Sequence, residues 1–107
     1  MLAPNEVHYS VLSADPDLAE LVDLFIAELP ERLAQLHHLL EAGNLVDLAR
    51  FAHQLKGAGG SYGFPQVTPV AADLERLARQ AADEILLRNA LNELIALTRQ
   101  LRAGLPE

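Results

Sequence analysis

The sequence predicts an all-α fold, an antiparallel up-down bundle of amphipathic helices. Apolar residues recur every three or four positions along most of the 107 residues, which is the spacing of one helix face. Gly, Pro and capping residues divide this pattern at short intervals, so consecutive helices should run antiparallel. No stretch alternates apolar and polar residues between hairpin turns, so we expect no sheet. We expect an irregular arm over residues 1–14 and one helical domain over residues 15–107, since a chain of this length builds a single core.

The first helical region follows the arm. Asp15 can cap a helix whose first position is Pro16, where the missing N–H costs nothing. Pro30 then interrupts the apolar pattern, and it either kinks one long helix or opens a second one. Gly43 and Asn44 end the region, because Gly favours a helix C-terminus and Asn can cap the next helix. The apolar positions of this region are Leu18, Leu21, Val22, Phe25, Leu29, Leu33, Leu36 and Leu40.

Three further breaks define the rest of the bundle. A helix over residues 44–59 ends before the interruption at residues 63–65 (Gly-Phe-Pro). Pro69 lies near the start of the next helix, and Thr68 is able to cap it. A last helix follows over residues 85–101, before a terminal Gly-Leu-Pro sequence.

The composition excludes several functional classes. Cys is absent, so a disulfide framework, a thiolate metal site and a cysteine nucleophile are all excluded, and a cytoplasmic setting fits. The net charge of −7 argues against a nucleic-acid partner, which needs clustered Lys and Arg, and against docking to an anionic membrane. No apolar run approaches the roughly 18 residues of a membrane span, and residues 1–14 do not resemble a signal peptide.

The segment His53–Gly63 has an unusual composition for a helix. Lys56 follows His53 by one helical turn, and four glycines then occur within seven residues: Gly57, Gly59, Gly60 and Gly63. Each Gly in a helix interior costs roughly 0.5–1 kcal/mol against Ala. We expect access to compensate for this cost, since missing side chains let a partner approach the histidine. Close packing of helices is the alternative explanation for Gly59 and Gly63.

Helical geometry places His53 on the outer face of its helix. The buried stripe of this helix consists of Leu48, Ala52, Leu55 and Gly59, and His53 falls on the opposite side of the helical wheel. The surface around it is made of small or basic residues and is unobstructed. The partner-docking residues that we expect there are Val46, Ala49, Arg50, Gln54, Gly57 and Gly60.

His53 and Lys56 together suit phosphoryl transfer. Much of an ordinary imidazole is neutral at neutral pH and is a nitrogen nucleophile, which can take a phosphoryl group from an acyl phosphate and later return it. Lys56 can reach over the same turn and offset the negative charge of that group. A surface histidine on an ordinary helix is the plainer interpretation, and the glycine cluster weighs against it.

The order His53-Gln54-Leu55-Lys56-Gly57, with Gly60 and Gly63 behind it, resembles the signature of histidine-containing phosphotransfer (HPt) domains. The resemblance covers roughly residues 15–103 and implies four core helices preceded by a short extra helix. It implies that His53 is the phosphorylated residue, that Lys56 assists the phosphoryl group and that Gly57 lies at the docking surface.

The resemblance also assigns a role to Glu75. Family members often carry Gln or Glu at this position, close to the active histidine on the neighbouring helix. Glu75 could therefore accept a hydrogen bond from the imidazole Nδ1–H and orient the ring. A carboxylate there would also repel an incoming phosphoryl group, which weakens this assignment.

The partners implied are receiver domains that carry a phosphorylatable aspartate, and a hybrid histidine kinase is a further candidate. The Mg²⁺ ion would belong to the receiver, because this sequence has no carboxylate cluster to hold one, and we expect no metal or other cofactor here. There is also no nucleotide-binding loop. We therefore expect a monomeric phosphocarrier, not an enzyme that uses ATP, existing as a free-standing protein or as a module of a larger one. The alternative is a helical interaction module that binds receivers or kinases without accepting phosphate.

Overall fold

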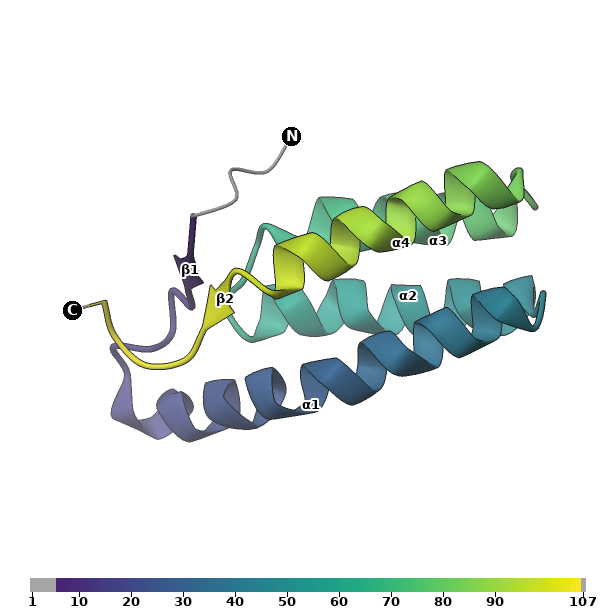
Figure 1. Cartoon of the computed structure of the whole chain (residues 1–107). Helices are drawn as coiled ribbons and strands as arrows, with labels where there is room; N and C mark the ends of the chain where they lie inside the picture. Colours follow the sequence, from purple (N-terminus) through teal and green to yellow (C-terminus); the bar gives the residue numbers. More distant parts are fainter. Residues whose placement is uncertain (1–5, 107) are drawn as a thin grey trace.

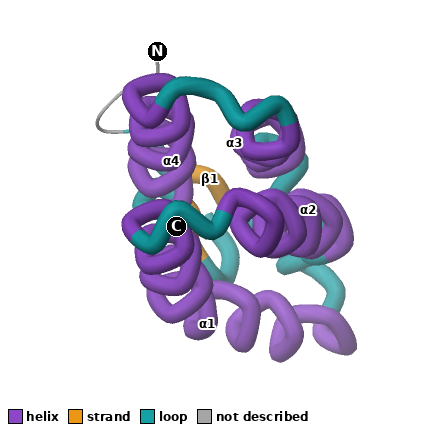
Figure 2. Tube along the Cα trace, turned by 90° about the vertical axis from the view of Figure 1, so that its right-hand side faces the viewer, coloured by secondary structure: helices purple, strands orange, loops and turns teal. Residues whose placement is uncertain are grey.

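The computed structural model describes residues 6–106 and contains four helices with a short strand at each end (Figure 1). The elements in order are β1 (His8–Tyr9), α1 (Pro16–Glu41), α2 (Leu45–Ser61), α3 (Val67–Arg79), α4 (Glu84–Thr98) and β2 (Leu101–Arg102). The predicted helical class is therefore confirmed for the described residues. The chain reverses direction between consecutive helices (Figure 1), and an end-on view shows the four helices around a common interior (Figure 2).

The structure decides whether Pro30 lies within one long helix or opens a second one. α1 is one continuous helix of 26 residues that contains Pro30 in its interior. Asp15 caps it as predicted, since its Oδ1 accepts a hydrogen bond from the Asp17 N–H at 2.9 Å, with Pro16 at the first helical position. The buried face of α1 consists of Val22, Phe25, Leu29, Leu36 and Leu40.

The closest helix pair is formed by α2 and α3. Asn44 caps α2 through the Asp47 N–H at 3.2 Å. A Cβ atom added at Gly59 would lie 2.6 Å from the Val67 Cβ, so the missing side chain allows α3 to approach this closely. The prediction that Thr68 caps the third helix is wrong, because α3 begins one residue earlier, at Val67. The Thr68 hydroxyl instead donates to the Lys56 carbonyl oxygen at 3.3 Å.

The prediction that the chain forms no sheet is wrong for four residues. β1 and β2 pair in parallel, with His8 opposite Leu101 and Tyr9 opposite Arg102. A strand of two residues is too short to show an alternating pattern in the sequence. The extra helix expected before the bundle does not occur over residues 6–15, where β1 and a turn are found instead; residues 1–5 of the expected arm lie outside the described residues.

The arm is fastened to the connection between α2 and α3. The Val11 N–H donates to the Gly63 carbonyl oxygen at 2.9 Å, and the Ser10 hydroxyl donates to the Tyr62 carbonyl oxygen at 2.6 Å. Gly63 has a φ of +82°, a conformation that glycine adopts without strain. Gly63 therefore has a structural role, which agrees with the alternative explanation of close packing given for it above. No helix of residues 6–106 is long and apolar enough to cross a membrane.

Candidate functional site

His53 lies on the exposed face of α2, opposite its buried stripe. Its side chain is 59% exposed, whereas Leu48, Ala52 and Leu55 on the other side of the helix are almost completely buried. The orientation expected from the helical wheel is therefore confirmed. The imidazole is open to a second molecule while its helix is held firmly by the core.

Glu75 reaches His53 from the neighbouring helix α3. The His53 Nδ1 lies 3.2 Å from Glu75 Oε1 and 3.1 Å from Oε2, and the Glu75 side chain is only 10% exposed. Leu74 and Ala78 on the same helix are buried in the core, so the backbone of α3 fixes where this carboxylate sits. The structure thus brings together two groups that are 22 residues apart in the sequence.

Two cations complete the surroundings of the Glu75 carboxylate. Lys56 Nζ donates to Oε1 at 2.8 Å, and Arg79 donates to Oε2 from Nε at 3.0 Å and lies within 2.9 Å of it through Nη2. The hydrogen bond from Lys56, together with those from Arg79 and His53, lowers the pKa of Glu75 to about 2, although partial burial acts in the opposite direction. Glu75 is therefore an ionised acceptor at neutral pH.

The charge state of Glu75 determines which nitrogen of His53 is free. An ionised carboxylate only accepts hydrogen bonds, so the Nδ1 of His53 must carry the hydrogen between them. In the neutral ring the lone pair then resides on Nε2. The arrangement yields an oriented nitrogen nucleophile on an exposed face, with an ammonium group one helical turn away.

The two cations also offset the repulsion that a carboxylate at this position would exert on an incoming phosphoryl group. Glu75 carries one negative charge, and Lys56 and Arg79 carry two positive charges against it. The side chains of Lys56, Glu75 and Arg79 line part of an open hollow of about 420 Å³ between α2 and α3. An incoming phosphoryl group would therefore meet a cluster with a net positive charge.

The four glycines of the segment divide into two pairs. Gly59 and Gly63 serve the fold, as described above. At Gly57 an added Cβ would meet nothing within 4 Å, and at Gly60 it would meet only the Thr68 Oγ1 at an ordinary 3.5 Å. Both residues are exposed. The packing of this chain therefore gives no reason for the missing side chains at Gly57 and Gly60.

Most of the expected docking residues are exposed, and one is not. Val46 is 81% exposed, and Arg50 and Gln54 also lie at the surface. Ala49 is buried at 3%, so its assignment to an exposed docking surface is wrong. The wheel considers a single helix, whereas α3 covers this flank of α2: Ala49 shares a surface hollow with Ala78 of α3.

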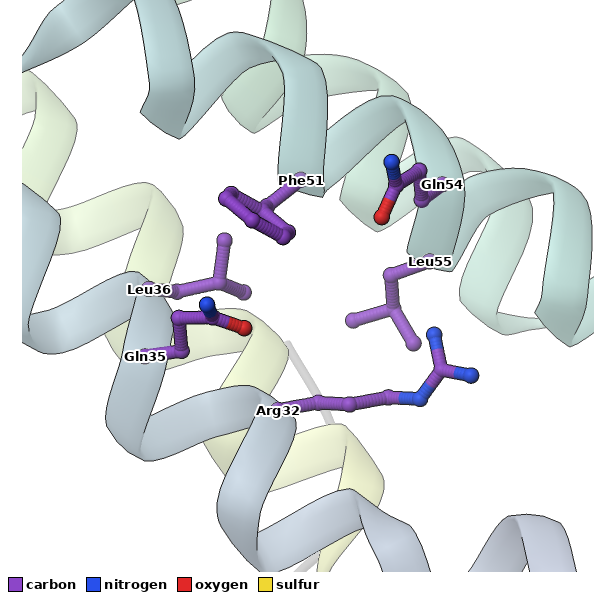
Figure 3. A pocket seen from close by; sticks show the side chains of 6 residues that line it. All are labelled: Arg32, Gln35, Leu36, Phe51, Gln54 and Leu55. Atoms are coloured by element: carbon purple, nitrogen blue, oxygen red, sulfur yellow. The ribbon is translucent and has the colours of Figure 1, made fainter.

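A groove lies between α1 and α2 (Figure 3). It has a volume of about 200 Å³. Its lining is Arg32, Gln35, Leu36, Phe51, Gln54 and Leu55. Figure 3 shows Phe51, Gln54 and Leu55 of α2 facing the three residues of α1. Gln54, one of the expected docking residues, therefore lines a groove that is partly polar.

Sequence reasoning missed Arg79, which contacts the carboxylate that holds His53. The signal was present, because Arg79 follows Glu75 by four residues on a predicted helix, a spacing at which opposite charges pair. Among residues 6–106, no group of three or more His, Cys, Asp or Glu side chains is placed to hold a metal ion.

Comparison with known proteins identifies a family whose model matches this chain. The family model described as Hpt domain matches residues 20–104, which is well over half of the chain and includes every residue of the site described above. Searches of curated proteins and of solved structures found no match.

Proposed function

Because the chain belongs to the Hpt domain family, whose members are phosphocarriers in phosphorelays, we propose that it accepts a phosphoryl group on Nε2 of His53. The donor is the phospho-aspartate of a receiver domain, and the group then passes to the aspartate of another receiver. The observation that supports this most directly is the contact between His53 Nδ1 and the ionised Glu75, which leaves Nε2 as the nucleophile on an exposed face.

The transfer is an in-line displacement at phosphorus. The lone pair of Nε2 forms the new bond to phosphorus while the bond to the aspartyl oxygen breaks, and the aspartate leaves as a carboxylate with that electron pair. The hydrogen on Nδ1 stays in its hydrogen bond to Glu75. The imidazole ring gains positive charge in this step, which the Glu75 carboxylate stabilises.

Lys56 supplies charge stabilisation at the phosphoryl group. Lys56 lies one turn after His53 on the same face of α2 and its side chain is 29% exposed, so its ammonium can reach a group bound to the ring. Phosphoryl transfer requires mainly positioning and electrostatic stabilisation from the protein. This assignment gives Lys56 and Glu75 separate tasks, one at the phosphoryl group and one at the ring.

The receiver docks over the exposed face around His53. Val46, Arg50 and Gln54 supply contacts, and Gly57 and Gly60 allow the partner backbone to come close. The Mg²⁺ ion of the reaction is held by the receiver in this proposal. A hybrid histidine kinase that contains such a receiver is a suitable partner of the same chemistry.

Phosphotransfer profiling tests the proposal. A panel of receiver domains is first phosphorylated with a small acyl phosphate and then incubated with the protein. Phosphorylation of the protein is detected by its shifted gel mobility and by the acid lability of the bound phosphate. We expect transfer to the wild type and to His38→Gln, a control that replaces an exposed histidine of α1. We expect none to His53→Gln.

The same experiment distinguishes the competing function. A helical interaction module would bind receivers as tightly after His53→Gln as before, and no receiver would lose its phosphate to it. Stable complexes without acid-labile phosphate on the wild type would refute the phosphocarrier proposal.

A further inference from the structure

Two cations reach Glu75 from different helices and hold different oxygens. Lys56 of α2 meets Oε1, whereas Arg79 of α3 meets Oε2 through two nitrogens at 3.0 and 2.9 Å. Arg79 lies one turn after Glu75 on the same helix, so helix geometry brings the two side chains together. A planar guanidinium that directs two N–H groups at one carboxylate oxygen holds that oxygen in a more defined geometry than an ammonium does.

A phosphoryl group on His53 would compete with Glu75 for the ammonium of Lys56. A phosphoryl group brings about two negative charges, so it attracts the ammonium more strongly than one carboxylate does. When Lys56 moves, Oε1 of Glu75 keeps only its contact with His53. Without Arg79, the Glu75 carboxylate, which is 10% exposed, would then have no cation beside it and would draw Lys56 back or turn away from the ring.

We propose that Arg79 is a positioning residue for phosphoryl transfer: it anchors Glu75 through Oε2, so that Lys56 can leave Oε1 for the phosphoryl group while His53 stays oriented. The inference rests on the proposed phosphocarrier function. It assigns Lys56 to the phosphoryl group and Glu75 to the imidazole. Arg79 acts through Glu75 and has no contact with the reacting atoms.

A double-variant cycle with a matched control tests this role. The variants are Arg79→Gln, Arg79→Lys, Glu75→Gln and the combination of Glu75→Gln with Arg79→Gln. The control is Arg76→Gln, because Arg76 lies on the same helix beside the same hollow but pairs with Asp73 instead of Glu75. Two quantities are measured for each: the rate of phosphotransfer from a charged receiver, and the fraction of the His53 ring with its hydrogen on Nδ1, by nitrogen NMR of the unphosphorylated protein.

We expect Arg79→Gln to slow transfer about tenfold, the factor that corresponds to one charge-assisted hydrogen bond. The same variant should lower the Nδ1–H fraction of His53. Arg79→Lys, which keeps the charge without the fork of donors, should recover part of both. Arg76→Gln should behave as the wild type, and adding Arg79→Gln to Glu75→Gln should change nothing further.

Two results would overturn the proposal. One is a wild-type transfer rate and an unchanged Nδ1–H fraction in Arg79→Gln. The other is a combined variant whose loss is the product of the two single losses, since Arg79 would then act independently of Glu75. The NMR measurement needs no phosphate. If the wild type accepts no phosphate but the Nδ1–H fraction of His53 still falls in Arg79→Gln, the phosphocarrier function is refuted and the anchoring of Glu75 by Arg79 is supported.

Discussion

Replacing Gly57 by Ala separates the two explanations of the glycine-rich segment, because stability and transfer should change in opposite directions. The new Cβ would meet nothing within 4 Å in this chain, and the residue lies inside α2. The substitution should therefore stabilise the helix by about 0.5–1 kcal/mol. For a domain of this size, that free energy corresponds to a rise in melting temperature of about 2–4 °C.

Phosphotransfer by Gly57→Ala should fall in spite of this gain in stability. A methyl group at the proposed point of closest approach would force the receiver outward. Overpacking of this kind costs about 1–3 kcal/mol, which corresponds to about a 5-fold to 150-fold lower transfer rate at a limiting receiver concentration. Thermal unfolding and transfer kinetics measured on the same preparation give both quantities. A loss of transfer in a more stable protein cannot be attributed to misfolding.

Asn92→Ala is the matched control for Gly57→Ala. Asn92 is an exposed residue within α4, so the change to Ala should also raise stability by a few tenths of a kcal/mol and leave transfer unchanged. If Gly57→Ala raised the melting temperature and transferred phosphate at the wild-type rate, access for a partner would no longer explain this glycine.

Three further predictions concern pH and the fold. The pKa of Glu75 is lowered from 4.5 to about 2, so this group stabilises the folded state above pH 4.5 and loses that effect as the pH falls toward 2; Glu75→Gln should flatten the acid limb of stability measured by urea unfolding across this range. Gly63→Ala should destabilise the protein by about 1–3 kcal/mol, since its φ is +82° and a Cβ would collide with the Ser10 hydroxyl; thermal unfolding would show it, and an unchanged melting temperature would contradict it. Pro30→Ala should raise the free energy of unfolding by up to about 3 kcal/mol, because the exposed proline lies inside a continuous helix; a decrease would indicate that the proline shapes α1 in a way the core requires.

The helices could be predicted from local chemistry, whereas the contacts between distant segments could not. Asp15 and Asn44 cap their helices as the sequence indicates, because a cap depends on residues two or three positions away. Thr68 is not a cap because α3 already begins at Val67, and its hydroxyl contacts another helix, at the Lys56 carbonyl oxygen. The pairing of His8 with Leu101 joins residues almost a full chain length apart, which no local pattern can reveal.

The same division applies to the site. The exposure of His53 follows from the period of one helix, and the structure agrees with it. The burial of Ala49 depends on how α3 lies across the flank of α2, so the wheel alone gave the wrong answer. The contact between Glu75 and His53 came from a family resemblance, while Arg79 could have been found from its spacing to Glu75 but was not.

The distribution of charge reconciles a cationic site with an acidic protein. The chain carries a net charge of −7, yet α1 holds six acidic residues against one basic residue, whereas α2 and α3 together hold four basic residues against three acidic ones. An approaching partner whose own active site is acidic is therefore repelled along α1 and tolerated at the face of α2 and α3 that presents His53. Since one of the three acidic residues of α2 and α3 is Glu75, whose charge is balanced by Lys56 and Arg79, the charge that orients the imidazole would not obstruct the arrival of the proposed phosphoryl group.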